Sequence, residues 1–142
     1  MKTPIDENIK NLFREQRFAV IATQGKNEPY TNLVSFLAGK DFKKIYFPTS
    51  KKSKKYENIS KYPGISMLVD NRDNKPEDIK NAIAVNVFGK SKETKNKEII
   101  DNFLIKHPYL KDFINSPDCT MIQIDVEKCI AVDNFQNVKI FK

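Results

Sequence analysis

The sequence predicts a mainly β protein with flanking helices, arranged as an antiparallel barrel of six to eight strands. Short apolar segments recur along the chain and are separated by breaks at Gly25, Gly39 and Gly64. The connections between the early segments are too short for helical crossovers, which favours antiparallel neighbours over a parallel sheet. Only three stretches have helical periodicity. The fold class therefore rests on strand spacing, loop length and the scarcity of helices.

The N-terminal segment predicts an amphipathic helix that ends near Gln16. Thr3 is suited to the N-cap position and Pro4 to the first helical position. The predicted buried face consists of Ile5, Ile9, Leu12 and Phe13, which follow a helical period. We therefore expect this helix to cover one part of the barrel.

The β segments follow in a regular series, and most alternate apolar with polar residues or end at a turn signal. Gly89 lies inside one of them, which indicates a bulge or a close backbone approach. Pro48 ends the third strand. The predicted strands are 18–23, 30–38, 45–47, 65–69, 82–90, 122–126, 130–132 and 138–141.

Two further helices are predicted between these strands. The first follows the third strand, buries Tyr56 and Ile59, and ends before Pro63. The second covers 93–106. The polar stretch 70–81 reads as an excursion between strands, with a helical turn near its end.

The composition bounds the class of protein. With 142 residues, 39% hydrophobic and 30% charged, the chain is expected to form a single domain over residues 1–142. No apolar run reaches the length of a membrane span and no signal-peptide pattern opens the chain. A soluble, cytoplasmic protein is the expectation. Cys119 and Cys129 lack metal-site spacing and are interpreted as reduced, buried thiols.

The chain carries a formal net charge of +7, which favours phosphates, nucleotides or nucleic acid as partners. Arg14, Arg17 and Arg72 are the only arginines. Lysine acts as a point charge that suits a phosphate, whereas readout of base edges favours the guanidinium fork. Nucleic acid is therefore the less favoured partner.

Several chemistries can be excluded from the residues alone. The four glycines are too far apart for a dinucleotide-binding or Walker phosphate loop. His107 is the only histidine, so no histidine-based metal cluster is expected. We interpret His107 as a structural or surface residue. The paired acids at Asp6 and at Glu77 lie at predicted helix starts, where they are expected as caps.

The most informative segment runs from Thr49 to Asn58, where hydroxyls and lysines alternate between a strand and a helix. Thr49, Ser53, Lys54 and Lys55 supply donors and cations at a helix start, which is what a phosphate dianion requires. The alternative is a solvated lysine run in which a serine only caps the helix. Composition does not decide between these two readings.

The sequence resembles the flavin-nucleotide-binding split barrels related to pyridoxamine 5'-phosphate oxidase, over nearly its whole length. The segments that carry the resemblance are AVIATQGKNEPYTNLVSF (19–36), IYFPTSKKSKKYENISKYPGISMLVDNR (45–72), AVNVFGKS (84–91), HPYLKDFINSP (107–117) and VDNFQNVKIF (132–141). The resemblance implies a six- to eight-stranded split β-barrel, a homodimer, and FMN bound in a groove between protomers.

The same resemblance implies roles for individual residues. Ser53, Lys54 and Lys55 would hold the FMN phosphate, with Thr49 adding a hydroxyl. Val34, Ser35 and Phe36 would run along the flavin, giving backbone hydrogen bonds to the ring edge and apolar contact to its face.

The expected activity is that of an FMN-dependent oxidoreductase of unassigned small-molecule substrate, with no catalytic residue named. Tyr30 and Arg72 are candidates for the open side of the flavin. The oxidase uses C-terminal arginine and histidine for its substrate, and no arginine follows Arg72 here, which disfavours vitamin B6 oxidation. Alternatives are a carrier of FMN, haem or a deazaflavin, and a barrel that binds single-stranded nucleic acid through lysines and stacking aromatics.

Overall fold

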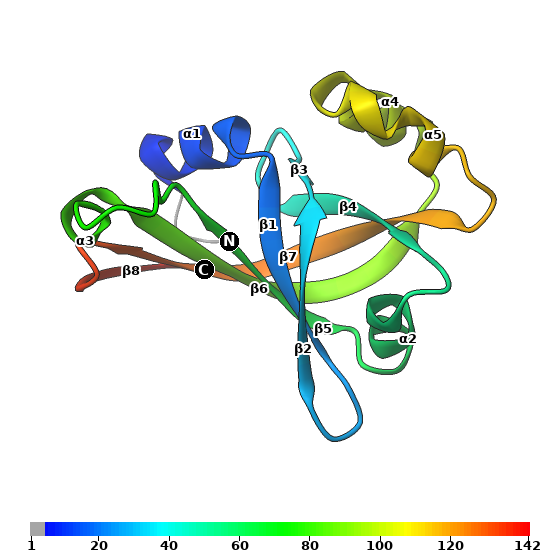
Figure 1. The fold of residues 1–142 in the computed structure, drawn as a ribbon, viewed down its shortest axis with the longest axis horizontal. Coiled ribbons are helices and arrows are strands. Elements are labelled where there is room, and N and C mark those ends of the chain that lie inside the picture. The colour runs from blue at the N-terminus through cyan, green and yellow to red at the C-terminus, as the bar shows by residue number, and fades with distance from the viewer. Residues whose placement is uncertain (1–4) are drawn as a thin grey trace.

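The computed structural model describes residues 5–142 and consists of one eight-stranded antiparallel sheet with helices at its edges (Figure 1). The predicted cap at Thr3 and Pro4 lies outside the described residues. The strands are β1 Phe18–Gln24, β2 Pro29–Ser35, β3 Leu37–Ala38, β4 Lys44–Ser50, β5 Gly64–Asp70, β6 Ile83–Thr94, β7 Cys119–Asp133 and β8 Asn137–Phe141. The helices are α1 Glu7–Glu15, α2 Lys54–Lys61, α3 Asp78–Asn81, α4 Lys97–Lys106 and α5 Lys111–Ile114, with a 3₁₀ turn at Pro108–Leu110.

The sheet curls into a half-barrel, which confirms the predicted fold class. Its strand order is β2-β1-β5-β6-β7-β4-β3, with β8 paired to β7. The first and last strands of this order, β2 and β3, are separated in the chain only by Phe36. The predicted strand 30–38 is thus divided, because its two halves pair with different neighbours. The chain itself joins the two ends of the curled sheet.

The helix α1 covers part of the core, as its periodicity predicts. Ile9, Leu12 and Phe13 are buried, and the N-cap is Asp6, whose carboxylate accepts a hydrogen bond from the Ile9 N–H at 3.1 Å. The helix ends at Glu15, one residue before the predicted end.

Two apolar clusters hold the fold together. The main one fills the inside of the half-barrel, where Ile21, Met67 and Val85 have no exposed surface. The second lies on the outer face, where α4 and α5 cover Tyr46 and Met121. Because the second cluster packs on the opposite side of the sheet, the parts of β4 and β7 around Tyr46 and Met121 are covered on both faces.

The longest strands extend beyond their predictions. Residues 122–126 and 130–132 belong to the single strand β7, and β6 continues to Thr94, which pairs with Met121. The helix predicted from Glu93 therefore begins only at Lys97. Cross-strand pairing overrides the local break signals here, because each added residue completes a ladder with its neighbour. Among residues 5–142, none of the helices is both long and apolar enough to cross a bilayer.

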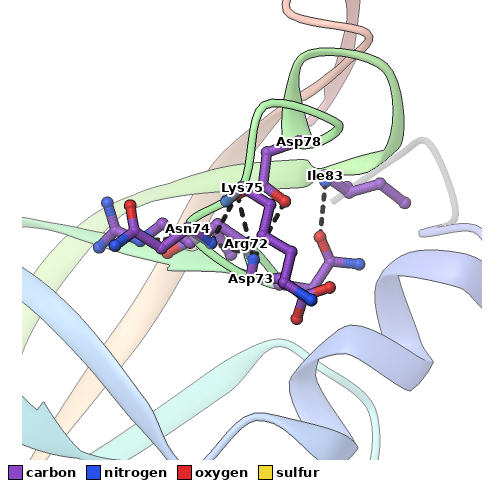
Figure 2. Close-up of polar contacts among 8 residues, drawn as sticks. Arg72, Asp73, Asn74, Lys75, Asp78 and Ile83 are labelled. Carbon is purple, nitrogen blue, oxygen red and sulfur yellow. Dashed lines mark hydrogen bonds and ion pairs between the residues drawn. The ribbon is translucent and has the colours of Figure 1, made fainter.

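The loop between β5 and β6 is organised by one carboxylate, that of Asp78 (Figure 2). It accepts hydrogen bonds of 2.8 to 3.2 Å from the backbone N–H groups of Asp73, Asn74 and Lys75. These bonds, led by that of Asp73, lower the pKa of Asp78. The acids at positions 77 and 78 were expected to cap a helix. The Asp78 carboxylate instead orders the loop that precedes α3.

Gly89 lies where β6 passes closest to β7. The register of this pair shifts between Phe88 and Gly89, so both predicted features, the bulge and the close approach, are present. A Cβ atom at position 89 would lie only 2.2 Å from the backbone oxygen of Asp125. The absence of a side chain is therefore required for this part of the β6–β7 ladder.

We expect the substitution Gly89→Ala to lower the free energy of unfolding by about 1–3 kcal/mol, because the two backbones must separate. Gly64→Ala is the matched control, since its Cβ would meet nothing nearer than the Lys90 ammonium at 3.9 Å. Urea denaturation of both variants measures the difference. Equal stability of the two would show that the close approach is not a constraint.

Candidate functional site

The lysine-rich segment occupies the turn from β4 into α2. Thr49 lies near the end of β4 and is buried, whereas Ser53 is the N-cap of α2. Their hydroxyl oxygens are 2.9 Å apart. The Ser53 hydroxyl also accepts the Tyr56 N–H at 3.2 Å and donates to the Ser50 carbonyl at 2.7 Å. The predicted strand-to-helix junction is present, and the capping alternative describes what Ser53 does in this structure.

The first turn of α2 leaves donors available. No hydrogen bond of the Lys54 or Lys55 backbone N–H is found within the described chain, as expected for a helix start. The Lys54 ammonium lies 3.5 Å from the Glu57 carboxylate. This ion pair is exposed and contributes little to stability. Lys55 is half-buried and has no carboxylate within 4 Å among residues 5–142. Backbone donors, dipole and one unpaired cation coincide at this helix start.

The segment 34–36 connects β2 to β3 and presents mainly its backbone. The side chains of Val34 and Phe36 are buried in the main core, with 6% and no exposed surface respectively. Both side chains therefore belong to the core of the half-barrel, and the expected apolar contact of this strand with a flavin face stays a prediction. Ser35 is half-buried, and β2 is an edge strand that pairs only with β1, so alternate backbone groups face its open edge.

The two segments approach each other through β4. β3 pairs with β4 with Leu37 opposite Tyr46, and β2 also contacts β4. One segment lies at the end of β2 and the other begins at the end of β4, and these two strands are in contact.

The two candidates for the open side of a flavin lie in different places. Tyr30 is opposite Thr23 in the β1–β2 pair, and the Thr23 hydroxyl accepts a hydrogen bond from Asn58 of α2 at 3.0 Å. Arg72 is paired with Asp70 at 3.1 Å, in the loop that precedes α3. Figure 1 shows α3 and α2 at opposite ends of the molecule. Arg72 is therefore not brought to the lysine segment of the same chain.

Asn32 is a candidate that the sequence reasoning missed. It is opposite Ile21 on the inward face of β2, two residues before Val34, and its side-chain oxygen is buried without a hydrogen-bond partner. A buried unpaired acceptor is costly, so it marks a position where a ligand donor would be favourable. The sequence signal that could have identified Asn32 is a polar residue at a strand position whose side chain points inward.

His107 holds the β2–β3 connection in place. It has no exposed surface, its Nε2 lies 2.9 Å from the Phe36 carbonyl oxygen, and its Nδ1 lies 2.8 Å from the Tyr109 hydroxyl. Burial is the main cause that lowers the pKa of His107, assisted by the positive charges of Lys106 and Arg17. The structural reading of this histidine is the one that its contacts support.

The thiols and acids of residues 5–142 form no metal-binding arrangement. Both cysteines lie in β7 and are free, and burial raises the pKa of Cys129 to about 11. Burial also raises the pKa of Cys119. Within residues 5–142, no three side chains of His, Cys, Asp or Glu come together as a metal site.

The fold and this strand-to-helix site define a small half-barrel protein of a known class. The family model described as pyridoxamine 5'-phosphate oxidase matches residues 5–133. The chain belongs to this family. No curated protein matches the chain in sequence.

Solved structures share the fold at low sequence identity. General Stress Protein 26 from Bacillus anthracis str. Sterne is 20% identical with a TM-score of 0.77, and 96% of each chain is covered. A heme binding protein from Mycobacterium smegmatis is 13% identical with a TM-score of 0.83, covering 96% of this chain and 57% of that chain. A FAD-binding protein from Mesorhizobium loti is 15% identical with a TM-score of 0.70, covering 89% and 94%.

The buried His107 predicts a pH dependence of stability. Its folded pKa lies below the unfolded value of about 6.5, so the unfolded chain takes up a proton first as the pH falls. The contribution to stability is complete above pH 6.5 and is lost as the pH falls toward the folded pKa. Denaturation series from pH 8 to 5 measure this loss.

The variant His107→Asn provides the control for this titration. We expect it to be less stable than the native protein at pH 8 by about 1–3 kcal/mol, and to lack the histidine-dependent loss below pH 6.5. Because the chain has a single histidine, the difference between the two series belongs to this residue. Identical slopes in both proteins would contradict the assignment.

Proposed function

We propose that this protein binds FMN at the junction of β4 and α2, and that it is an oxidoreductase of a small-molecule substrate that acts through this flavin. The observation that carries the proposal is the helix start itself: unpaired backbone N–H groups, a half-buried Lys55 and paired hydroxyls at one place. Membership of the pyridoxamine 5'-phosphate oxidase family supports the same reading. The solved FAD-binding structure of the same fold also supports a flavin.

The phosphate would be held mainly by α2. The N–H groups of Lys54 and Lys55 point out of the first turn, where the helix dipole favours an anion. The Lys55 ammonium lacks a carboxylate partner among the described residues, so it is the principal candidate for a charge-assisted bond. The Ser53 and Thr49 hydroxyls would bind the phosphate only after the 2.9 Å hydrogen bond between them breaks.

The ring would lie along the open edge of β2. The backbone of Val34 to Phe36 and the Ser35 side chain supply hydrogen-bonding groups there, and the unpaired Asn32 oxygen is an acceptor on the same strand. FMN supplies hydride or single-electron transfer when bound. The protein's residues would bind and orient it without acting as acid or base.

A flavin fits this chain better than haem ligated by histidine. His107 is the only histidine, and both of its ring nitrogens are engaged, with the Phe36 carbonyl and the Tyr109 hydroxyl. An axial ligand from this residue would require that both contacts break. The anion-binding helix start, in contrast, is available without rearrangement of the backbone.

We also propose that the protein forms a homodimer through the outer face of its sheet. One row of cross-strand neighbours crosses that face from β2 to β8 and consists of Leu33, Val20, Leu68, Asn86, Ile130 and Ile140. Leu33 is 69% and Ile140 is 52% exposed, and Phe18 and Val138 extend the same apolar surface. Monomeric proteins rarely expose a contiguous patch of this kind. A partner on this face would complete a groove beside β2.

The phosphate assignment is tested by Ser53→Asp, which retains a good N-cap but places a negative charge beside the phosphate. We expect FMN affinity to fall by more than about 2 kcal/mol, through repulsion and the loss of a hydroxyl donor. Lys55→Ala should weaken binding in the same assay, which is quenching of flavin fluorescence on titration with protein.

Lys61→Ala is the matched control, because Lys61 lies in the last turn of the same helix and pairs only with Glu57, at 3.6 Å. It should bind FMN as the native protein does. Unchanged affinity in both Ser53→Asp and Lys55→Ala would contradict the assignment of the phosphate to α2.

The dimer is tested by Leu33→Asp, which places a charge at the β2 end of the apolar face, on a side chain that is 69% exposed and outside the core. We expect the native protein to have the mass of two chains and the variant the mass of one, by sedimentation or light scattering. Ile105→Asp is the control, because Ile105 is 79% exposed but lies on α4. A native mass of one chain in the presence of FMN would contradict the proposal.

A further inference from the structure

We propose that the cavity between α1, the β3–β4 turn and the end of α4 binds a small amphipathic carboxylate, with Lys106 as the residue that pairs with the carboxylate group. This inference does not depend on the proposed flavin function, because the cavity shares no lining residue with the segments at 34–36 and 49–55. The cavity has a volume of about 370 Å³ and is lined by Phe13, Arg14, Leu37, Ala38, Gly39, Lys40, Phe42 and Lys106.

The walls of the cavity divide into an apolar body and a cationic part. Phe13 and Phe42 stack with ring centroids 6.0 Å apart, and Leu37 and Ala38 add aliphatic surface. Arg14, Lys40 and Lys106 supply positive charge, and no acidic residue lines the cavity. The volume falls within the range typical of small-ligand sites. This composition fits a ligand with an apolar or aromatic body and one negative group.

Lys106 is a cation without a counter-ion. Its ammonium donates to the Phe13 carbonyl at 3.2 Å and lies 4.2 Å from the centroid of the Phe36 ring. Among residues 5–142, no carboxylate lies within 4 Å of it. This amine is half-buried, so it bears part of the desolvation cost of a buried charge, which a bound anion would offset.

The groups around Lys106 increase this cost. Arg17, which follows α1, is the charged group that acts on it most strongly, and Arg14 from α1 and Lys40 from the turn share the cavity lining with it; all three are positive. Burial lowers the pKa of His107, its neighbour in the chain. Arg14 is partly neutralised by Glu7, at 3.1 Å. Burial and the charge of Arg17 lower the pKa of Lys106 to about 8.

A bound carboxylate would reverse this shift. The anion stabilises the charged amine, so binding is linked to retention of the Lys106 proton. Affinity should be highest below pH 8 and should decline as the pH rises through 8, because the free protein then loses the proton that the complex requires. Arginine does not titrate in this range, and Lys40 is exposed.

The experiment uses benzoate as the probe and benzamide as its neutral isostere, with the full chain and calorimetric titration at pH 6.5 and 9.5. We expect benzoate to bind at pH 6.5 and benzamide to bind about tenfold more weakly or worse. Inorganic phosphate should not displace benzoate at equal concentration. Equal affinity for the two aromatics, or displacement by phosphate, would overturn the assignment of an amphipathic carboxylate.

Two variants identify the residue. Lys106→Met keeps the aliphatic stem and should lower benzoate affinity about tenfold at pH 6.5. Lys106→Arg keeps the charge but cannot titrate, so it should bind benzoate at both pH values. Lys26→Met, on the exposed turn between β1 and β2, is the control and should behave as the native protein. If Lys106→Met binds normally, or if Lys106→Arg retains the native decline with pH, Lys106 is not the ligand.

Discussion

The connection from β2 to β3 through Phe36 is the constraint on which the rest of the structure depends. These two strands lie at opposite ends of the sheet order, so the sheet must curl until one residue can join them. Phe36 meets this requirement with no exposed surface, and its backbone is held on both sides. Its N–H donates to the Arg17 carbonyl at 3.3 Å, and its own carbonyl is bonded to His107.

The same connection organises both sites described above. On one side of Phe36, Val34 and Ser35 form the end of β2. This strand contacts β4, which is followed by α2. On the other side, the Phe36 ring contacts Lys106, which lines the cationic cavity. Lys106 and His107 are adjacent at the C-terminal end of α4. His107 bonds the Phe36 carbonyl of the β2–β3 connection, and Lys106 lines the cavity. Order at Phe36 is therefore a condition for either site.

Local patterns in the sequence predicted most of the fold. The helical period at Ile9, Leu12 and Phe13, and the glycine at the close approach of β6 to β7, each express a constraint that acts within a few residues. The division of strand 30–38 and the union of 122–132 into one strand were not predicted. Both depend on which distant strands become neighbours, which residue alternation does not specify.

For the candidate site, the sequence predicted the local strand-to-helix geometry but not the contacts between distant residues. The strand-to-helix junction at Thr49 to Lys55 follows from local turn and capping chemistry, so it could be inferred from the segment alone. The inward direction of Val34 and the unpaired oxygen of Asn32 depend on the register of β2 with β1. The position of Lys106 beside Phe13 depends on contacts between residues 93 positions apart.

In the proposed function, the junction of β4 and α2 holds a flavin within a dimer. The most direct measurement is size-exclusion chromatography of the FMN-loaded protein, with simultaneous detection of mass and of absorbance at flavin wavelengths. We expect flavin to elute with a species of two chains at a ratio of one FMN per chain. A protein that elutes without flavin after loading, at any mass, would contradict it.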